Sequence, residues 1–175
     1  GEAAVSEAES EAQVEDELRQ VANGRRQLAP VSAAQELERA AKICGRAKQA
    51  VVSMFEEVRM GNAVDVGGAK LLVEEIADSV SRNPGALISL ARLKTADDYT
   101  YMHSVAVCAM MVALAKPLGL AQAQTRSAGL AGLLHDLGKA VILVDVLNQP
   151  GKLTYAAFPI IQTHPVQGHN IRLVG

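Results

Sequence analysis

The residues of this sequence best suited to chemistry are its histidines and one aspartate beside a histidine. His135 and Asp136 stand next to each other in the apolar stretch LLHDLGKA, and Lys139 follows three positions after the aspartate. His103 and His164 lie near the ends of other apolar segments. A buried carboxylate is unfavourable unless it is paired or bound to a metal. Imidazole nitrogen with carboxylate oxygen suits Zn, Fe, Mn and similar ions, so these residue types predict a metal site.

Asp136 is the residue predicted to bridge a metal pair, because a carboxylate has two oxygens and a neutral imidazole cannot bridge. Such a pair would lower the pKa of a shared water and hold a phosphoryl oxygen. Lys139 would then contact phosphate as a point charge. A plainer interpretation makes His135 a core histidine, pairs Asp136 with Lys139 at i,i+3 and leaves His164 at a helix end. The residues alone leave both interpretations open, and His169 is predicted to lie on the surface without a role.

The composition of the chain predicts an all-α protein that can position such a site. Hydrophobic residues make up 49% of the 175 residues and aromatic residues only 3%, so the core must consist of small aliphatic side chains, which suit close-packed helices. A net charge of −2 argues against general DNA or RNA binding. Cys44 and Cys108 have no metal-type spacing and are predicted to be buried in a reducing compartment.

The sequence shows neither a signal peptide nor a membrane span. Its longest apolar run, residues 105–115, is far shorter than the roughly 20 residues that cross a bilayer. We therefore expect a cytoplasmic protein without membrane contact.

Three segments are predicted. Residues 1–31 are an acidic helical segment or linker, residues 32–96 a helical lead-in, and residues 97–175 a second helical unit. From Ser32 to about residue 60, apolar residues follow 3,4 spacing over three heptads, which predicts a long amphipathic helix. This helix would either pack on its own domain or form a homodimer. The apolar positions are Leu37, Ala40, Cys44, Ala47, Val51, Met54 and Val58.

Capping signals predict the next two helices. Asp65 is predicted to cap a helix that runs to about Arg82. Asn83 followed by Pro84 is typical of an N-cap and the first helical position, and so opens a short helix over ALISLARL. The residues of the longer helix predicted to face inward are Leu72, Ile76 and Val80.

The site residues fall on the later elements. Asp97 or Asp98 is predicted to open the helix YTYMHSVAVCAMMVALA, which is apolar nearly all round and should be central. AQAQTRSAGLAGLLHDL is predicted to be a helix ending at Gly138. AVILVDVL is read as an extended or short helical connector, and Thr154 is predicted to cap a helix that ends at about Thr163.

Four stretches together resemble the HD-GYP family, a branch of the HD phosphohydrolase superfamily. YTYMHSVAV, LLHDLGKA, VLNQPGKLT and THPVQGH occur in the family's order and approximate spacing, from about Asp97 to the end. The resemblance implies an HD-type helical bundle with a divalent metal pair, Fe, Mn or similar. It implies a phosphodiesterase that hydrolyses the bacterial second messenger cyclic di-GMP by in-line attack of metal-activated water. The products would be the linear dinucleotide and, in some members, GMP.

The resemblance implies a role for each candidate residue. His103 resembles the first histidine ligand, and His135 with Asp136 resembles the paired ligands, of which Asp136 bridges. His164 resembles a ligand of the second metal, and Lys139 resembles a lysine near the scissile phosphate. Asp136 and Lys139 are therefore the expected catalytic residues.

The chain also departs from the family pattern. Members with a third metal carry a glutamate four residues before the first histidine; here Tyr99 stands there, so we expect two metals. The sequence stops at Gly175, before the His-His-Glu motif, the Gly-Tyr-Pro loop and the final aspartate of the family. We therefore expect an apparently truncated front half of the domain, with poor turnover by itself, from a longer molecule.

Two other functions remain open at the level of sequence. One is a catalytically inactive HD-GYP-like domain that signals to a protein partner through the 32–60 helix. The other is an HD phosphohydrolase that acts on a different nucleotide.

Overall fold

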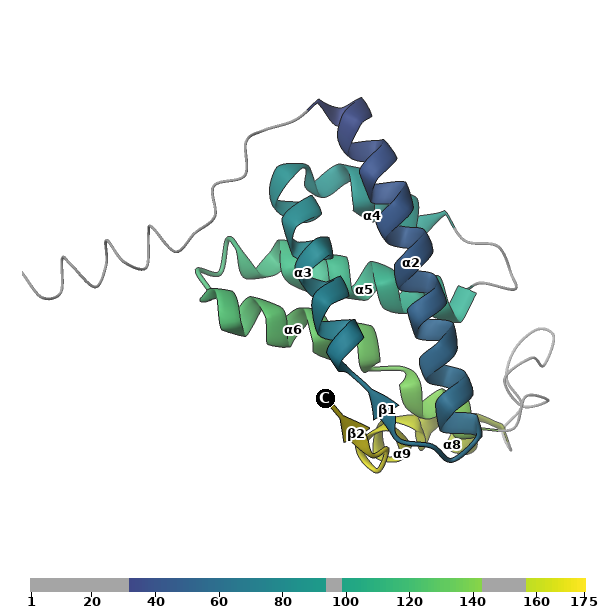
Figure 1. The fold of residues 1–175 in the computed structure, drawn as a ribbon. Helices are drawn as coiled ribbons and strands as arrows, with labels where there is room; N and C mark the ends of the chain where they lie inside the picture. The colour runs from purple at the N-terminus through teal and green to yellow at the C-terminus, as the bar shows by residue number, and fades with distance from the viewer. Residues whose placement is uncertain (1–31, 94–98, 143–156) are drawn as a thin grey trace, which may run out of the picture.

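The computed structural model describes residues 32–93, 99–142 and 157–175, and its regular structure there is almost all helical (Figure 1). This confirms the all-α prediction. A two-residue parallel strand pair, which was not predicted, joins the end of the described chain to the segment after the first helix. The elements are α2 (Ala33–Arg59), β1 (Val64–Asp65), α3 (Gly67–Arg82), α4 (Pro84–Arg92), α5 (Tyr99–Ala115), α6 (Gln122–Leu134), the 3-10 turn η1 (Leu137–Val141), α8 (Ala157–Gln162), α9 (His164–His169) and β2 (Leu173–Val174).

The long helix α2 confirms the amphipathic helix expected after Ser32. The Ser32 side chain caps it by accepting a hydrogen bond from the Gln35 backbone N–H at 3.3 Å. All of its predicted stripe except Leu37 is buried, and α2 contacts α3, α4 and α5 of the same chain. The heptad pattern is thus explained by packing within one chain. It lends no support to a homodimer through this helix, which stays a prediction.

Helices α3 and α4 follow their capping signals with one change. Asn83 caps α4 by accepting a hydrogen bond from the Gly85 N–H, with Pro84 in the first turn, as predicted. The predicted cap Asp65 is one position too early, because Val66 holds the N-cap position of α3. The Asp65 carboxylate still accepts a hydrogen bond from the Gly67 N–H at 2.8 Å, so it performs the capping chemistry from the neighbouring position.

The inward face of α3 also differs from the prediction by one residue. Ile76 and Val80 are buried as expected, whereas Leu72 is only half-buried and Val73 is buried in its place. A stripe of Ala69, Val73, Ile76 and Val80 keeps the helical 3,4 spacing.

The apolar helix α5 lies at the centre of the bundle, as predicted, and contacts α2, α3, α4 and α6. Its predicted capping residues, Asp97 and Asp98, lie outside the described residues. None of the described helices combines the length and apolar character needed to cross a membrane. A cytoplasmic location stays a prediction.

The prediction that the next helix continues to Gly138 is wrong. Helix α6 ends at Leu134, and the chain tightens into η1 from Leu137. His135 and Asp136 occupy the break between the two elements. A break of this kind frees side chains from the 100° separation that adjacent residues have on one helix, so both can turn toward the same space.

The C-terminal part contains two short helices where one was predicted. Helix α8 ends at Gln162, Thr163 makes a turn, and α9 begins at His164. The predicted cap Thr154, most of AVILVDVL and the acidic segment 1–31 lie outside the described residues. Helix α9 and β2 lie together beside β1 at one end of the bundle (Figure 1).

One continuous hydrophobic core extends from α2 to η1. It includes residues on both sides of the boundary proposed near residue 96, such as Val51 and Leu87 on one side and Val105 and Leu133 on the other. The segments 32–96 and 97–175 therefore pack together in the part that is described, and the domain boundary stays a prediction.

A buried ion-pair network joins the first turn of α2 to the last turn of α3. Glu36 is fully buried, yet its carboxylate accepts three hydrogen bonds. The Ser79 hydroxyl donates to Oε1 at 2.7 Å, and the Arg82 guanidinium donates to both carboxylate oxygens, at 2.7 and 3.2 Å. Burial alone raises the pKa of Glu36, but the hydrogen bonds from Arg82 and Ser79 outweigh it, so the pKa is lowered.

Both cysteines are buried free thiols, as predicted. Burial raises the pKa of Cys44 to about 11 and that of Cys108 to about 12. Only the thiolate is nucleophilic, so we expect alkylation in the folded protein at pH 8 to be roughly 100-fold slower than after unfolding in urea. Mass spectrometry of iodoacetamide-treated samples would measure this. Native-state labelling at the unfolded rate would show that the thiols are accessible.

Candidate metal centre

The structure brings the four predicted ligands and Lys139 together around one carboxylate. The side chain of Asp136, only 3% exposed, lies where α5, the end of α6, η1 and α9 meet. His103 Nε2 is 3.9 Å and His135 Nε2 3.4 Å from Asp136 Oδ2, and His164 Nε2 is 3.4 Å from Asp136 Oδ1. His103 and His164 are 61 positions apart in the sequence, and only the fold makes these residues neighbours.

The two oxygens of Asp136 face different partners. Oδ2 faces His103 and His135, whose ligand atoms lie with that of Asp136 within 4.8 Å of one another. Oδ1 instead faces His164, whose Nε2 lies 3.4 Å away. A carboxylate with a histidine nitrogen before each oxygen has the donor arrangement that a bridging ligand requires.

Backbone carbonyl groups orient two of the histidine rings. His135 Nδ1 lies 2.8 Å from the carbonyl oxygen of Gly132, and His164 Nδ1 lies 2.7 Å from that of Ile161. If Nδ1 carries the proton in each ring, it donates to the carbonyl, and Nε2 is left with its lone pair toward Asp136. Metal-binding histidines are held in this way by a hydrogen bond from the other ring nitrogen.

Close packing between α5 and α6 sets the relation of His103 to His135. A side chain on Gly132 would place its Cβ 3.1 Å from the backbone nitrogen and Cα of Cys108, so the two helices cross almost in backbone contact. The rings of His103 and His135 are consequently 5.3 Å apart between centroids. Tyr99 stacks on the His103 ring, with ring centroids 6.0 Å apart and planes 6° from parallel.

Lys139 lies at the site and pairs with Asp136, as the plainer interpretation of the sequence predicted. Its Nζ donates a hydrogen bond to Asp136 Oδ2 at 2.7 Å, three residues along the chain. The lysine charge therefore partly compensates the buried carboxylate. The phosphate contact predicted for Lys139 stays a prediction. His169 is exposed, as predicted.

The donor set of this cluster fits divalent transition metals. Neutral imidazole and carboxylate are the ligand types that Fe, Mn and Zn share, and three of the residues offer donor atoms close enough to surround one ion. We therefore consider His103, His135, Asp136 and His164 the residues that could hold a metal pair.

Sequence reasoning missed the parts of the site that belong to the backbone. The carbonyl groups of Gly132 and Ile161 each lie three residues before the histidine that they orient. A histidine at a helix C-terminus can reach such a carbonyl, and this spacing could have suggested both contacts. The stacking of Tyr99 follows from its place one helical turn before His103.

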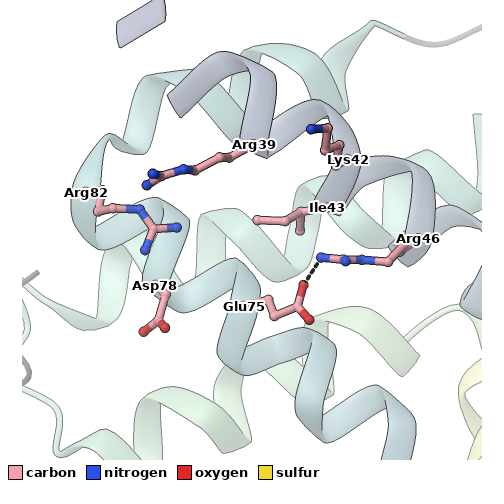
Figure 2. Close-up of a pocket in the computed structure, with 7 residues that line it drawn as sticks. All are labelled: Arg39, Lys42, Ile43, Arg46, Glu75, Asp78 and Arg82. Atoms are coloured by element: carbon pink, nitrogen blue, oxygen red, sulfur yellow. Dashed lines mark hydrogen bonds and ion pairs between the residues drawn. The ribbon is translucent and has the colours of Figure 1, made fainter. Parts of the chain in front are cut away.

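An open pocket elsewhere on the molecule has a different chemical character. It lies between α2 and α3, and Figure 2 shows Arg39, Lys42 and Arg46 opposite Glu75, Asp78 and Arg82. Its four cations all have carboxylate partners: Arg46 pairs with Glu75, Lys42 with Glu38, and both Arg82 and Arg39 with Glu36. No residue of the histidine cluster lines it. We interpret it as an ion-paired surface that joins the two helices.

Comparisons with known proteins relate the chain to bacterial cyclic dinucleotide enzymes. It is 54% identical, over 145 residues, to a Pseudomonas aeruginosa protein named cyclic di-GMP phosphodiesterase PA4108, an alignment that covers 83% of this chain and 35% of the relative. It is 34% identical over 95 residues to the 3′3′-cGAMP-specific phosphodiesterase 1 of Vibrio cholerae, covering 54% of this chain and 21% of that protein.

A third relative and a family model add to this result. The cyclic di-GMP phosphodiesterase response regulator RpfG of Xanthomonas campestris is 38% identical over 58 residues, which are 33% of this chain and 15% of that protein. Residues 1–69 match a domain of unknown function, DUF3391. No solved structure matched the chain. The chain thus spans about a third of the length of the Pseudomonas relative.

Proposed function

We propose that this chain, which is related to the HD-GYP family, carries part of the active site of a metal-dependent phosphodiesterase that hydrolyses cyclic di-GMP. The observation that carries the proposal is the buried Asp136 carboxylate, with histidine nitrogens before both of its oxygens. The printed names of the Pseudomonas and Xanthomonas relatives support the substrate.

In this proposal each residue has one task. Asp136 would be the carboxylate shared by a divalent metal pair of the Fe or Mn type, and His103, His135 and His164 would supply nitrogen ligands to it. Such a pair, when bound, would supply a water of lowered pKa and neutralise charge on the phosphate. Lys139, whose Nζ already lies in the site, would contact a phosphate oxygen of the substrate. The product would be the linear dinucleotide, GMP or both.

The first test compares His135→Ala with His169→Ala in the intact protein that carries this chain. His135 belongs to the cluster and His169 is an exposed histidine outside it. We expect His135→Ala to lower both the bound metal and the rate of cyclic di-GMP hydrolysis at least tenfold, because it removes one nitrogen ligand. We expect His169→Ala to change neither by more than about twofold.

The readouts are elemental analysis and chromatography of the nucleotide products. Equal metal content and turnover in both variants would contradict the site. Bound metal in the wild-type protein without turnover would favour the non-catalytic signalling function instead.

A second candidate substrate is supported by the Vibrio relative, which is named for 3′3′-cGAMP. The two cyclic dinucleotides share the phosphodiester that the cluster would meet and differ in one base. A comparison of kcat/KM for both at equal metal loading separates them. A preference for 3′3′-cGAMP of more than tenfold would replace cyclic di-GMP as the proposed substrate.

A further inference from the structure

Helix α9 lies against η1 in direct backbone contact at Gly138. A Cβ on Gly138 would overlap the carbonyl oxygen of His164 and lie 2.5 Å from the backbone nitrogen of Gly168. Both are backbone atoms, so no flexible side chain can move aside. Gly138 is not among the described glycines with positive φ, so its backbone angles do not demand glycine. The requirement at this position is for space alone.

This contact lies between two of the candidate ligands. Gly138 is two residues after Asp136, in a turn that is fixed by the hydrogen bond from the Lys139 N–H to the Asp136 carbonyl at 2.9 Å. On the other side, the backbone atom that it touches belongs to His164 itself. The 3.4 Å between His164 Nε2 and Asp136 Oδ1 therefore depends on how closely α9 approaches η1.

Helix α9 has little else to hold it at this distance. None of its residues is buried, and its main contacts are with η1. The segment after α9 is attached to the bundle by the strand pair, in which the N–H groups of Val64 and Val66 donate to the carbonyls of Arg172 and Val174 at 2.9 and 2.8 Å. A shift of α9 would therefore change the distance between His164 and Asp136, and it would also disturb the hydrogen bonds between β2 and β1.

We propose that Gly138 is a positioning residue, whose missing side chain sets the approach of His164 to Asp136 and thereby the place of His164 in the candidate metal centre. This inference rests on the proposed function for its metal readout. An added methyl group must push α9 outward by a large fraction of an ångström or more. Metal ligands have to be held within about 0.5 Å of their working positions.

The chain offers a matched control in the same contact. A Cβ on Gly168, which faces Gly138 across the interface, would lie 3.5 Å from the Gly138 nitrogen and 3.7 Å from its Cα. These are ordinary van der Waals distances, so Gly168→Ala adds the same methyl group without displacing α9. Alanine also suits a helix better than glycine does.

The first measurement is Co²⁺ binding, followed by its visible absorption spectrum, in the wild-type protein, Gly138→Ala and Gly168→Ala. We expect Gly138→Ala to weaken binding at least tenfold and to change the spectrum, because one histidine leaves the coordination sphere. We expect Gly168→Ala to stay within about twofold of wild type. Wild-type affinity and spectrum in Gly138→Ala would overturn the proposal.

The second measurement needs no metal. Amide hydrogen exchange at Val64 and Val66 should accelerate in Gly138→Ala and not in Gly168→Ala, because outward movement of α9 loosens β2. If the wild-type protein binds no Co²⁺, the proposed function fails, and the exchange result alone decides whether Gly138 positions α9. Unchanged exchange in Gly138→Ala would overturn the positioning.

Thermal unfolding, measured by circular dichroism, completes the test. Since α9 lies outside the core, Gly138→Ala should retain the helical spectrum of the folded protein. Global unfolding of this variant would show that Gly138 is required for the fold itself and would overturn its assignment as a positioning residue.

Discussion

Asp136→Asn is expected to lower metal affinity and cyclic di-GMP turnover at least about 100-fold. This loss is larger than the one expected from mutating a residue that only orients a metal ligand. Asparagine has nearly the same volume, so the buried site should remain packed. It loses the negative charge and replaces one acceptor oxygen by an N–H donor, which cannot bind a metal. Because His103, His135 and His164 all face this one carboxylate, no other described side chain of the cluster can substitute for it.

The matched control for this experiment is Asp78→Asn. Asp78 lines the pocket between α2 and α3 (Figure 2), and none of the residues lining that pocket belongs to the histidine cluster. Metal content measured by elemental analysis and turnover with cyclic di-GMP should stay at wild-type values there. If Asp136→Asn also kept both values, Asp136 could not be the bridging ligand.

Arg82→Ala is expected to destabilise the protein by about 3–5 kcal/mol at neutral pH, the usual effect of leaving a buried charge without its partner. Glu36 is fully buried and receives two of its three hydrogen bonds from Arg82. Urea denaturation would measure the change. Arg126→Ala is the control, because Arg126 pairs with Glu74 at 3.3 Å while both are nearly half exposed. Such a pair contributes about 0–1 kcal/mol, and equal effects of the two variants would contradict the network.

The pH dependence of this effect has a definite sign. Burial raises the pKa of Glu36, hydrogen bonds from Arg82 and Ser79 lower it more, and the folded-state pKa is below the unfolded one. The stabilisation is therefore complete above the unfolded pKa and disappears as the pH falls through the folded pKa. In Arg82→Ala the carboxyl group keeps its burial, the Ser79 hydroxyl and the Arg39 guanidinium 3.9 Å away, but it loses the hydrogen bonds and charge of Arg82, so its pKa should rise. The difference between wild type and variant should shrink toward acidic pH, and a constant difference would exclude the charge of Glu36 as its cause.

The features that could be predicted from sequence are those with local physical causes. Asn83 and Pro84 begin α4 because a capping oxygen and a fixed φ act within one helical turn. The stripe of α2 is buried because its spacing places these side chains on one face. Both signals lie within a few residues of the structure that they determine.

The features that could not be predicted depend on residues far apart in the sequence. Glu36 is an ordinary first-turn acid of a helix in the sequence, and its burial is tolerated because Ser79 and Arg82 on α3 donate hydrogen bonds to it. Likewise, helix α6 ends at Leu134, and η1 follows with α9 packed directly against it at Gly138. No local sequence pattern predicts that contact.

The candidate site was predicted as a set of residues but not as an arrangement. A metal-binding role for His135 and Asp136 could be proposed from their types, and the motif order supplied His103 and His164 as candidates. The distances to Asp136, the carbonyl groups that orient two rings and the contact of Lys139 with the same carboxylate come from packing between helices. Residue types indicate which ligands are present, and tertiary structure decides where they point.

The parallel pairing of β1 with β2 also has a consequence for the order of folding. Helices α2 to α6 form contacts mostly between sequence neighbours and can associate early, whereas β1 must wait for the segment after α9 to be synthesised. Contacts of such long sequence separation form late, since closing the loop loses entropy before any contact is gained. His164 belongs to that late segment. A nascent chain would thus have His103, His135 and Asp136 in place first, and the proposed metal centre would gain His164 only after the bundle has formed.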